Sequence, residues 1–168
     1  SAENKARIGT FLVGVFGVLG TISSIPLLNR FGRKTMILVS DTIMCFCLLF
    51  SAVFVLFDLI IGNIILTLIF FYAFNIGYGP CLWIYSAETL DAYGASIVSL
   101  LNMINTWIFG TFSNLAFKYF TAPGVYFSLT TIQIVTSIFV FYYLKETKGK
   151  TKEECEKIYM TEASKTSS

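Results

Sequence analysis

Histidine is absent from this 168-residue chain, and only four residues are cysteine. The missing imidazole removes the side chain that most often serves as a general base or as a metal ligand. The cysteines lack the CxxC spacing of zinc and redox sites, and no long apolar stretch carries a pair of carboxylates. The sequence therefore predicts no metal site and no cofactor, and it gives almost no support to an enzyme.

Charge is scarce as well. Charged residues make up 13% of the chain, whereas about 25% is typical of soluble domains, and hydrophobic residues make up 55%. The net charge of +2 is too small to indicate a nucleic-acid partner. We therefore expect the lipid bilayer, and no nucleic acid, as the main surroundings of this chain.

Long apolar stretches fill most of the sequence. They cover Ile8–Leu28, Thr35–Phe57, Ile60–Tyr85, Ile97–Phe117 and Gly124–Leu144. About 20 residues in a helix cross the hydrocarbon layer of about 30 Å, and helices satisfy their own backbone hydrogen bonds in lipid. The run 64–73 does not alternate as a barrel strand would. We predict an all-α membrane protein with five transmembrane helices over residues 1–144; a large buried helical core is the alternative.

Lysine and arginine set the orientation. Nine of the twelve basic residues lie either in the first short loop or after the last apolar stretch, and the positive-inside rule assigns that side to the cytoplasm. The beginning of the chain is then outside, where Lys5 and Arg7 fit poorly. Because the chain also begins with Ser1 rather than Met, we expect a piece of a longer protein whose earlier helices are missing, and we expect it in the plasma membrane.

The segment 145–168 follows the last apolar stretch and is predicted to be a cytoplasmic tail. Its part from Lys150 to Met160 is charged and moderately amphipathic, which indicates a short helix. The part from Thr161 to Ser168 is typical of a disordered end.

Two arginines and two glutamates fall at the predicted cytoplasmic ends of the helices. They are Arg30, Arg33, Glu88 and Glu146. Charge-assisted pairs among them would tie one group of helices to another and bias a two-state equilibrium. The alternative for the arginines is that they only anchor the loop at the membrane surface.

Three segments resemble signatures of one family. Asn29-Arg30-Phe31-Gly32-Arg33-Lys34 resembles the D/N-R-x-G-R-R/K signature of the major facilitator superfamily. The segment 77–88 resembles G-x-G-P-x-x-W…S/A-E of the sugar porters, and 146–151 is similar to their P-E-T-K-G-K/R-S/T tail. The resemblance covers the whole chain and implies helices eight to twelve of a twelve-helix carrier, a partial carboxy-terminal bundle. It also implies transport of a hexose or related sugar or polyol by alternating access, together with the missing amino-terminal helices.

The third apolar stretch carries the candidate substrate face. The resemblance implies that Trp83 faces the sugar, and Asn75, Gly79 and Trp83 share a helix face at spacings of four. An indole offers a platform and an N–H donor, and an amide both donates and accepts. Gly77, Gly79 and Pro80 predict a break in this helix that would serve gating. The alternative is that Trp83 and Pro80 are ordinary residues of a membrane helix.

The fourth stretch is unusually polar. Ser99, Asn102, Thr106 and Ser113 share one face and predict the wall of a cavity. Asn105 and Trp107 resemble an Asn-Trp pair of sugar porters, with one residue interposed. Both are candidate substrate ligands, although the extra residue turns them to nearly opposite faces, so at most one is expected to reach the substrate.

Two further positions leave the function open. Many sugar porters carry a sugar-binding Asn where this chain has Gly17, so a carrier of another organic solute is an alternative, as is a truncated membrane protein that does not transport. Asp41 lies inside the second stretch, where an unpaired charge is costly. We expect it to pair with Lys34, one heptad earlier; a role in proton coupling, with a proton as a further partner, is the alternative.

Overall fold

The computed structural model describes residues 2–119, 121–150 and 153–155, apart from the side chains of 2–6, 113–114 and 117. Its helices are α1 (Ala2–Phe31), α2 (Arg33–Leu56), α3 (Ile60–Ala73), the π-helix η1 (Phe74–Tyr78), α4 (Gly79–Thr89), α5 (Ala92–Tyr119) and α6 (Ala122–Tyr143). No strand occurs in these ranges. The predicted all-α class is confirmed. Most of the predicted tail helix and all of the predicted disordered end lie outside the described residues.

Five helical segments are long and apolar enough to cross a membrane. They are Arg7–Phe31, Arg33–Leu56, Ile60–Thr89, Ala92–Phe112 and Ala122–Tyr143. The third of them runs through α3, η1 and α4 without interruption. Many large apolar side chains on these segments are exposed, as expected where lipid or further helices cover them. The chain is a multi-pass membrane protein with the five transmembrane helices that the sequence predicted.

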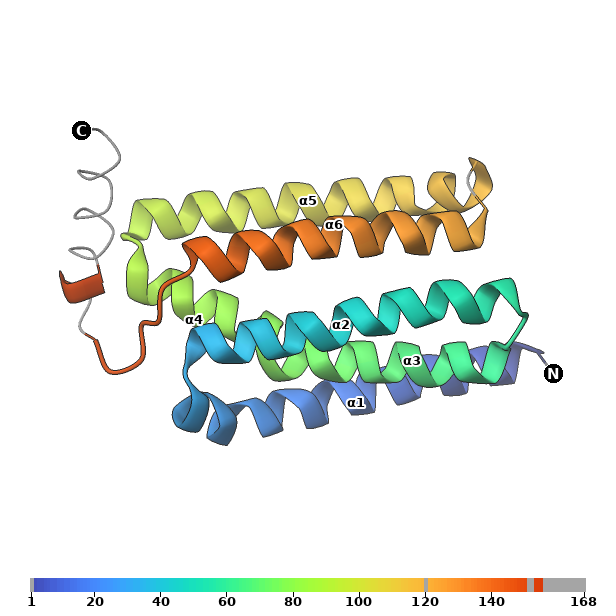
Figure 1. Ribbon diagram of the computed structural model, residues 1–168, viewed down its shortest axis with the longest axis horizontal. Coiled ribbons are helices and arrows are strands. Elements are labelled where there is room, and N and C mark those ends of the chain that lie inside the picture. The colour runs from blue at the N-terminus through green and yellow to red at the C-terminus, as the bar shows by residue number, and fades with distance from the viewer. Residues whose placement is uncertain (1, 120, 151–152, 156–168) are drawn as a thin grey trace.

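The connections alternate between the two ends of the bundle (Figure 1). The turn between α1 and α2, the link between α4 and α5 and the end of α6 lie at one end, and the link between α2 and α3 lies at the other. This arrangement follows from helices that each cross the full thickness of the layer. It brings the charged residues at the ends of α1, α2 and α4 to the same end of the bundle as the charged segment that follows α6.

Helix α2 is the centre of the packing. It packs against α6 along one side and against α3 and η1 along another, while α1 packs against α3 and η1. The buried cluster of this core consists of Leu28, Met36, Ile37, Cys81 and Val140. Helix α2 therefore joins α6 on one side to α3 and η1 on the other.

The third membrane segment changes its helical geometry just before Pro80. The Gly79 N–H donates to the Phe74 carbonyl five residues earlier, which is the π-helical pattern. Pro80 follows in the first turn of α4, where its missing N–H is tolerated. The break predicted at Gly77, Gly79 and Pro80 thus coincides with a π-helical turn, and the segment remains helical through it.

Two glycines let η1 approach its neighbours. A Cβ atom at Gly77 would lie 2.5 Å from the Met36 carbonyl oxygen of α2. A Cβ atom at Gly20 of α1 would lie 2.9 Å from the Tyr72 carbonyl oxygen and 2.9 Å from the Asn75 Cβ. Since backbone atoms cannot move aside as a flexible side chain does, η1 is held between α1 and α2 at backbone contact distance.

Replacing Gly77 with alanine is expected to destabilise the fold by about 1–3 kcal/mol, because the new methyl group overlaps backbone atoms of α2. The measurement is thermal unfolding of the complete protein in detergent. Gly14→Ala is the matched control, since a Cβ atom there meets nothing within 4 Å. Equal unfolding temperatures for the two variants would contradict the close contact at Gly77.

Candidate functional site

The carboxylate of Glu146 caps the first turn of α2. Its Oε1 accepts hydrogen bonds from the N–H groups of Arg33 at 2.9 Å and Lys148 at 3.0 Å, and its Oε2 accepts one from the Lys34 N–H at 3.1 Å. Gly32, at the N-cap position of α2, has no side chain to satisfy these donors. Glu146 supplies the missing acceptor from beyond α6, and its negative charge also matches the positive end of the helix dipole.

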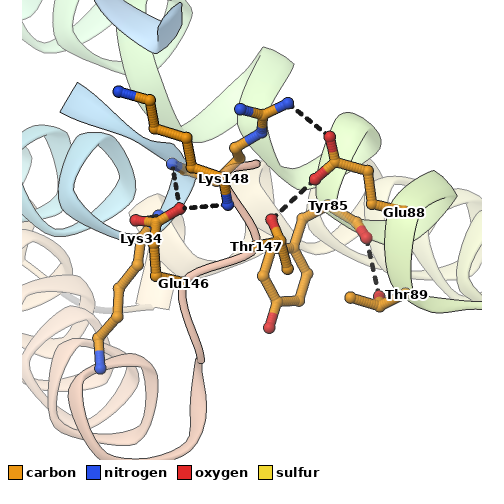
Figure 2. Close-up of polar contacts among 8 residues, drawn as sticks. Lys34, Tyr85, Glu88, Thr89, Glu146, Thr147 and Lys148 are labelled. Atoms are coloured by element: carbon orange, nitrogen blue, oxygen red, sulfur yellow. Dashed lines mark hydrogen bonds and ion pairs between the residues drawn. The ribbon is translucent and has the colours of Figure 1, made fainter. Parts of the chain in front are cut away.

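An ion pair joins α2 to α4. The Arg33 Nη2 atom lies 2.5 Å from Glu88 Oε1, and the Thr147 hydroxyl donates to the other oxygen of Glu88 at 2.7 Å. Figure 2 shows Glu88 of α4 next to Thr147. Both charged side chains are partly buried, with 19% and 28% of their surface exposed, so the pair is less screened than a surface pair.

The segment after α6 also reaches α1 and α4 through other contacts. The Lys148 ammonium donates to the Arg30 carbonyl at 2.8 Å, next to the end of α1. The backbone N–H of Lys145 donates to the buried Tyr85 hydroxyl of α4 at 3.2 Å. We call Arg33, Glu88, Glu146, Thr147 and Lys148 the end network (Figure 2). It ties the ends of α1, α2 and α4 to the segment that follows α6.

Of the four charged residues proposed from the sequence, Arg33, Glu88 and Glu146 meet in the end network. Arg30 contributes its carbonyl to this network, while its guanidinium lies 5.7 Å above the centre of the Phe31 ring. A cation over an aromatic face is attracted by the ring electrons. The structure therefore gives the two arginines of the loop different surroundings.

The turn between α1 and α2 needs glycine for two reasons. Gly32 has φ +88°, which disfavours residues with a Cβ atom, and such an atom would lie 2.6 Å from Glu146 Oε2. Gly149 shares only the first requirement, because it has φ +74° and open space around it. Comparing substitutions at Gly32 and Gly149 therefore distinguishes the cost of backbone strain from the cost of crowding by Glu146.

Gly32→Ala is expected to lower the unfolding temperature of the complete protein more than Gly149→Ala, because only the first change displaces the Glu146 carboxylate. Adding Glu146→Ala should make the further loss at Gly32 smaller, since the clash is then removed. Thermal unfolding of the four variants tests this. If Gly32→Ala costs the same with and without Glu146, the carboxylate does not crowd the turn.

Asn75 and Trp83 belong to the same membrane segment. Asn75 lies in the π-helix η1, and Trp83 lies in the α-helix α4. The Asn75 amide donates to the Phe71 carbonyl at 2.8 Å, and its Nδ2 lies 3.5 Å from the place where a Cβ at Gly17 would be. Trp83 is 48% exposed. The amide thus faces α1 at Gly17, and the indole is open to contact from outside the described helices.

The polar residues of α5 lie on an open surface. Asn102 and Asn105 help to line a wide hollow of about 430 Å³ on this helix. Trp107 is 66% exposed and is not among the lining residues. Thr106 is exposed and Ser99 is half-buried, whereas the side chain of Ser113 lies outside the description. Asn105 thus lines this hollow and Trp107 does not.

The expected pair between Asp41 and Lys34 is wrong. Asp41 is fully buried, and its carboxylate accepts hydrogen bonds from Gln133 and Ser137 of α6. The Lys34 ammonium instead donates to the Phe141 carbonyl at 2.9 Å. The heptad spacing put both residues on one face of α2, but the neighbouring helix α6 offers a nearer partner to each.

Several members of these sites were not predicted from the sequence. Thr147 and Lys148 belong to a motif that was recognised, but the motif does not say which groups they bond. Gln133 and Ser137 are spaced by four in the middle of α6. A polar pair at that spacing in a membrane helix points to one protein-facing side, and this signal could have identified a partner for Asp41.

Comparison with known proteins assigns the family. The family model described as "Sugar (and other) transporter" matches residues 2–159. The chain belongs to the sugar transporter family. A putative polyol transporter 2 of Arabidopsis thaliana is 31% identical over 94% of the chain, and the arabinose-proton symporter of Bacillus subtilis is 27% identical over 94% of it. The resemblance stated from the three motifs is confirmed.

This sugar transporter family chain spans about a third of the length of these relatives, covering 34% and 35% of them. The facilitated glucose transporter member 2 of Mus musculus is 31% identical over 86% of the chain, which covers 29% of that protein. The solved proton:xylose symporter XylE, bound to 6-bromo-6-deoxy-D-glucose, superposes with a TM-score of 0.78 at 22% identity, over 93% of this chain and 35% of that one. This likeness shows that the five helices adopt part of the major facilitator fold.

Proposed function

We propose that these helices are the carboxy-terminal part of a carrier that moves a hexose or a related sugar or polyol by alternating access. The family match over residues 2–159 carries the proposal. Relatives named as arabinose, polyol and glucose transporters support the choice of substrate class. In this proposal the carrier lies in the plasma membrane, with the end network on its cytoplasmic side.

The substrate contacts in this proposal are made by Trp83 and Asn75, with Asn105 or Trp107 as a further contact from α5. The exposed indole offers its face to the C–H groups of a sugar and its N–H to a hydroxyl. Millimolar affinity needs only about 4 kcal/mol, which one aromatic platform and a few hydrogen bonds provide. A carrier benefits from such weak binding because it must also release its substrate.

Much of the surface that would complete this site belongs to other helices. The indole of Trp83 and the polar face of α5 are both exposed. Polar side chains in a membrane protein are expected to face protein or water rather than lipid. We infer that amino-terminal helices of the same carrier close the substrate cavity over these residues.

The end network is proposed to hold the cytoplasmic side shut while the carrier faces outward. Its partly buried ion pair and its helix cap connect three helix ends, so separation of those ends breaks several bonds together. The π-helical turn at Gly77, with Gly79 and Pro80, is proposed as the place where the third membrane segment changes its bend.

The test is uptake of labelled glucose by the complete carrier in proteoliposomes, with competition by a panel of sugars, polyols and organic ions. Inhibition by hexoses or polyols, with no effect of the organic ions, supports the proposal. Vesicles that take up a labelled organic ion but no labelled sugar or polyol would favour the second candidate, a carrier of another solute. Gly17 favours that candidate, because this chain lacks a side chain at the position where many sugar porters carry a sugar-binding Asn.

A further inference from the structure

A buried carboxylate lies at the contact between α2 and α6, well away from the end network in sequence. Asp41 of α2 has none of its surface exposed. Its Oδ1 accepts a hydrogen bond from the Gln133 amide, and its Oδ2 lies within hydrogen-bond distance of the Ser137 hydroxyl. Both partners belong to α6, which packs closely along α2 (Figure 1). The proposed sugar site and gate use none of these three side chains.

The partners of Asp41 are neutral. Neither the Gln133 amide nor the Ser137 hydroxyl can balance a full negative charge, and an uncompensated charge among apolar helices is costly. The two cations on the same helix interact elsewhere, since Arg33 pairs with Glu88 and Lys34 donates to the Phe141 carbonyl. Among the described residues, the titratable groups close enough to Asp41 to feel its charge include Cys45 of α2 and Tyr78 of η1. Ordinary thiols and phenols are neutral at about pH 7, so these groups supply no positive charge.

Counting hydrogen atoms shows that the site accommodates an added proton. The Ser137 hydroxyl has one hydrogen but two acceptors within reach, Asp41 Oδ2 and the Gln133 carbonyl at 3.0 Å. When Asp41 is ionised, the hydroxyl donates to Oδ2. When Oδ2 carries a proton, Asp41 donates to Ser137 Oγ, and the hydroxyl turns to the Gln133 carbonyl. Rotation of one hydroxyl therefore satisfies both protonation states without moving heavy atoms.

We propose that Asp41, Ser137 and Gln133 form a proton-binding site between α2 and α6, with the proton on Asp41 while these helices are packed together. On release, the Oδ2–H bond breaks, the proton passes to a water molecule and the electron pair stays on the carboxylate. Because Asp41 is fully buried, water reaches it only when α2 and α6 separate locally. Proton exchange is thereby linked to movement of these two helices, whichever solute the carrier moves.

Infrared difference spectroscopy of the complete carrier tests this directly. An aspartate in water is ionised at about pH 7, so a protonated carboxyl at that pH marks an unusual site. The wild-type protein should show the carbonyl stretch of a protonated carboxylic acid, shifted by exchange into heavy water, and Asp41→Asn should abolish this band. Asp58→Asn is the matched control, because Asp58 lies exposed between α2 and α3 and should leave the band in place.

Two outcomes would overturn the proposal, namely a wild-type spectrum without the band at about pH 7, or an Asp41→Asn spectrum that keeps it. Since Asp41→Asn could fail to fold, Ser137→Ala provides a second test. Loss of the hydroxyl that accepts the hydrogen bond from protonated Asp41 should move the band to higher frequency, whereas Ser137→Thr, which keeps a hydroxyl, should not. A band unmoved by Ser137→Ala would also contradict the site. None of these readouts requires transport, so failure of this proposal can be distinguished from failure of the sugar-carrier proposal.

Discussion

Replacing Trp83 with alanine is expected to lower uptake of the transported sugar about ten-fold at subsaturating concentration. The indole of Trp83 is 48% exposed and offers the largest flat surface of the proposed substrate face. Losing its stacking and the apolar area it covers removes about 1.4 kcal/mol or more, which corresponds to a factor of ten in affinity. Initial uptake rates over a range of sugar concentrations should show a raised KM.

Two comparisons make this result specific to the sugar site. Trp83→Phe keeps an aromatic face but loses the N–H donor, so its uptake should fall between those of the wild type and Trp83→Ala. The amount of each variant in the membrane must match that of the wild type, so that a folding defect is separated from a binding defect. Unchanged uptake kinetics in Trp83→Ala would refute the assignment of this residue.

Replacing Arg33 with alanine is expected to make Cys81 accessible to water from the end of the bundle that carries the end network. Cys81 is fully buried in α4, in the same core cluster as Met36 near the start of α2. Without Arg33, Glu88 loses a partner at 2.5 Å, and the helix ends separate more often. Losing about 1.4 kcal/mol from this partly buried pair would raise the open population about ten-fold. Alkylation of Cys81 by a water-soluble maleimide, followed by mass spectrometry, measures this change.

Arg30→Ala is the matched control. It removes the other arginine of this loop, and the Arg30 guanidinium lies over Phe31 rather than beside Glu88. Its alkylation rate at Cys81 should stay near that of the wild type. In the exchanged pair Arg33→Glu with Glu88→Arg, Cys81 should react more slowly than in either single change, since the exchange restores opposite charges between α2 and α4. Equal rates for Arg33→Ala and the wild type would mean that the ion pair does not hold these ends together.

The sequence was sufficient to predict the transmembrane helices because their physical cause is local. An apolar run of about 20 residues crosses the bilayer as a helix whatever surrounds it. The clustering of Arg33, Glu88 and Glu146 was also predictable, because spans of full length bring alternate helix ends to the same side. The length and polarity of individual segments determine these features.

Features that depend on contacts between helices were not predictable in the same way. Pro80 indicated a break, but neither the π-helical form of η1 nor its close approach to α1 at Gly20 and to α2 at Gly77 follows from that residue. Glu146 was expected to pair with arginine side chains, whereas it accepts hydrogen bonds from backbone N–H groups that Gly32 leaves uncapped. Asp41 was assigned a partner on its own helix because the position of α6 cannot be read from spacing.

The central claim is that these helices belong to a carrier that moves sugar by alternating access, and substrate counterflow tests it most directly. Proteoliposomes containing the complete carrier are loaded with unlabelled hexose and diluted into a trace of labelled hexose. A carrier that alternates should accumulate label transiently above its equilibrium level, and Trp83→Ala should reduce this overshoot. Vesicles that take up no label with any hexose, pentose or polyol would contradict the account.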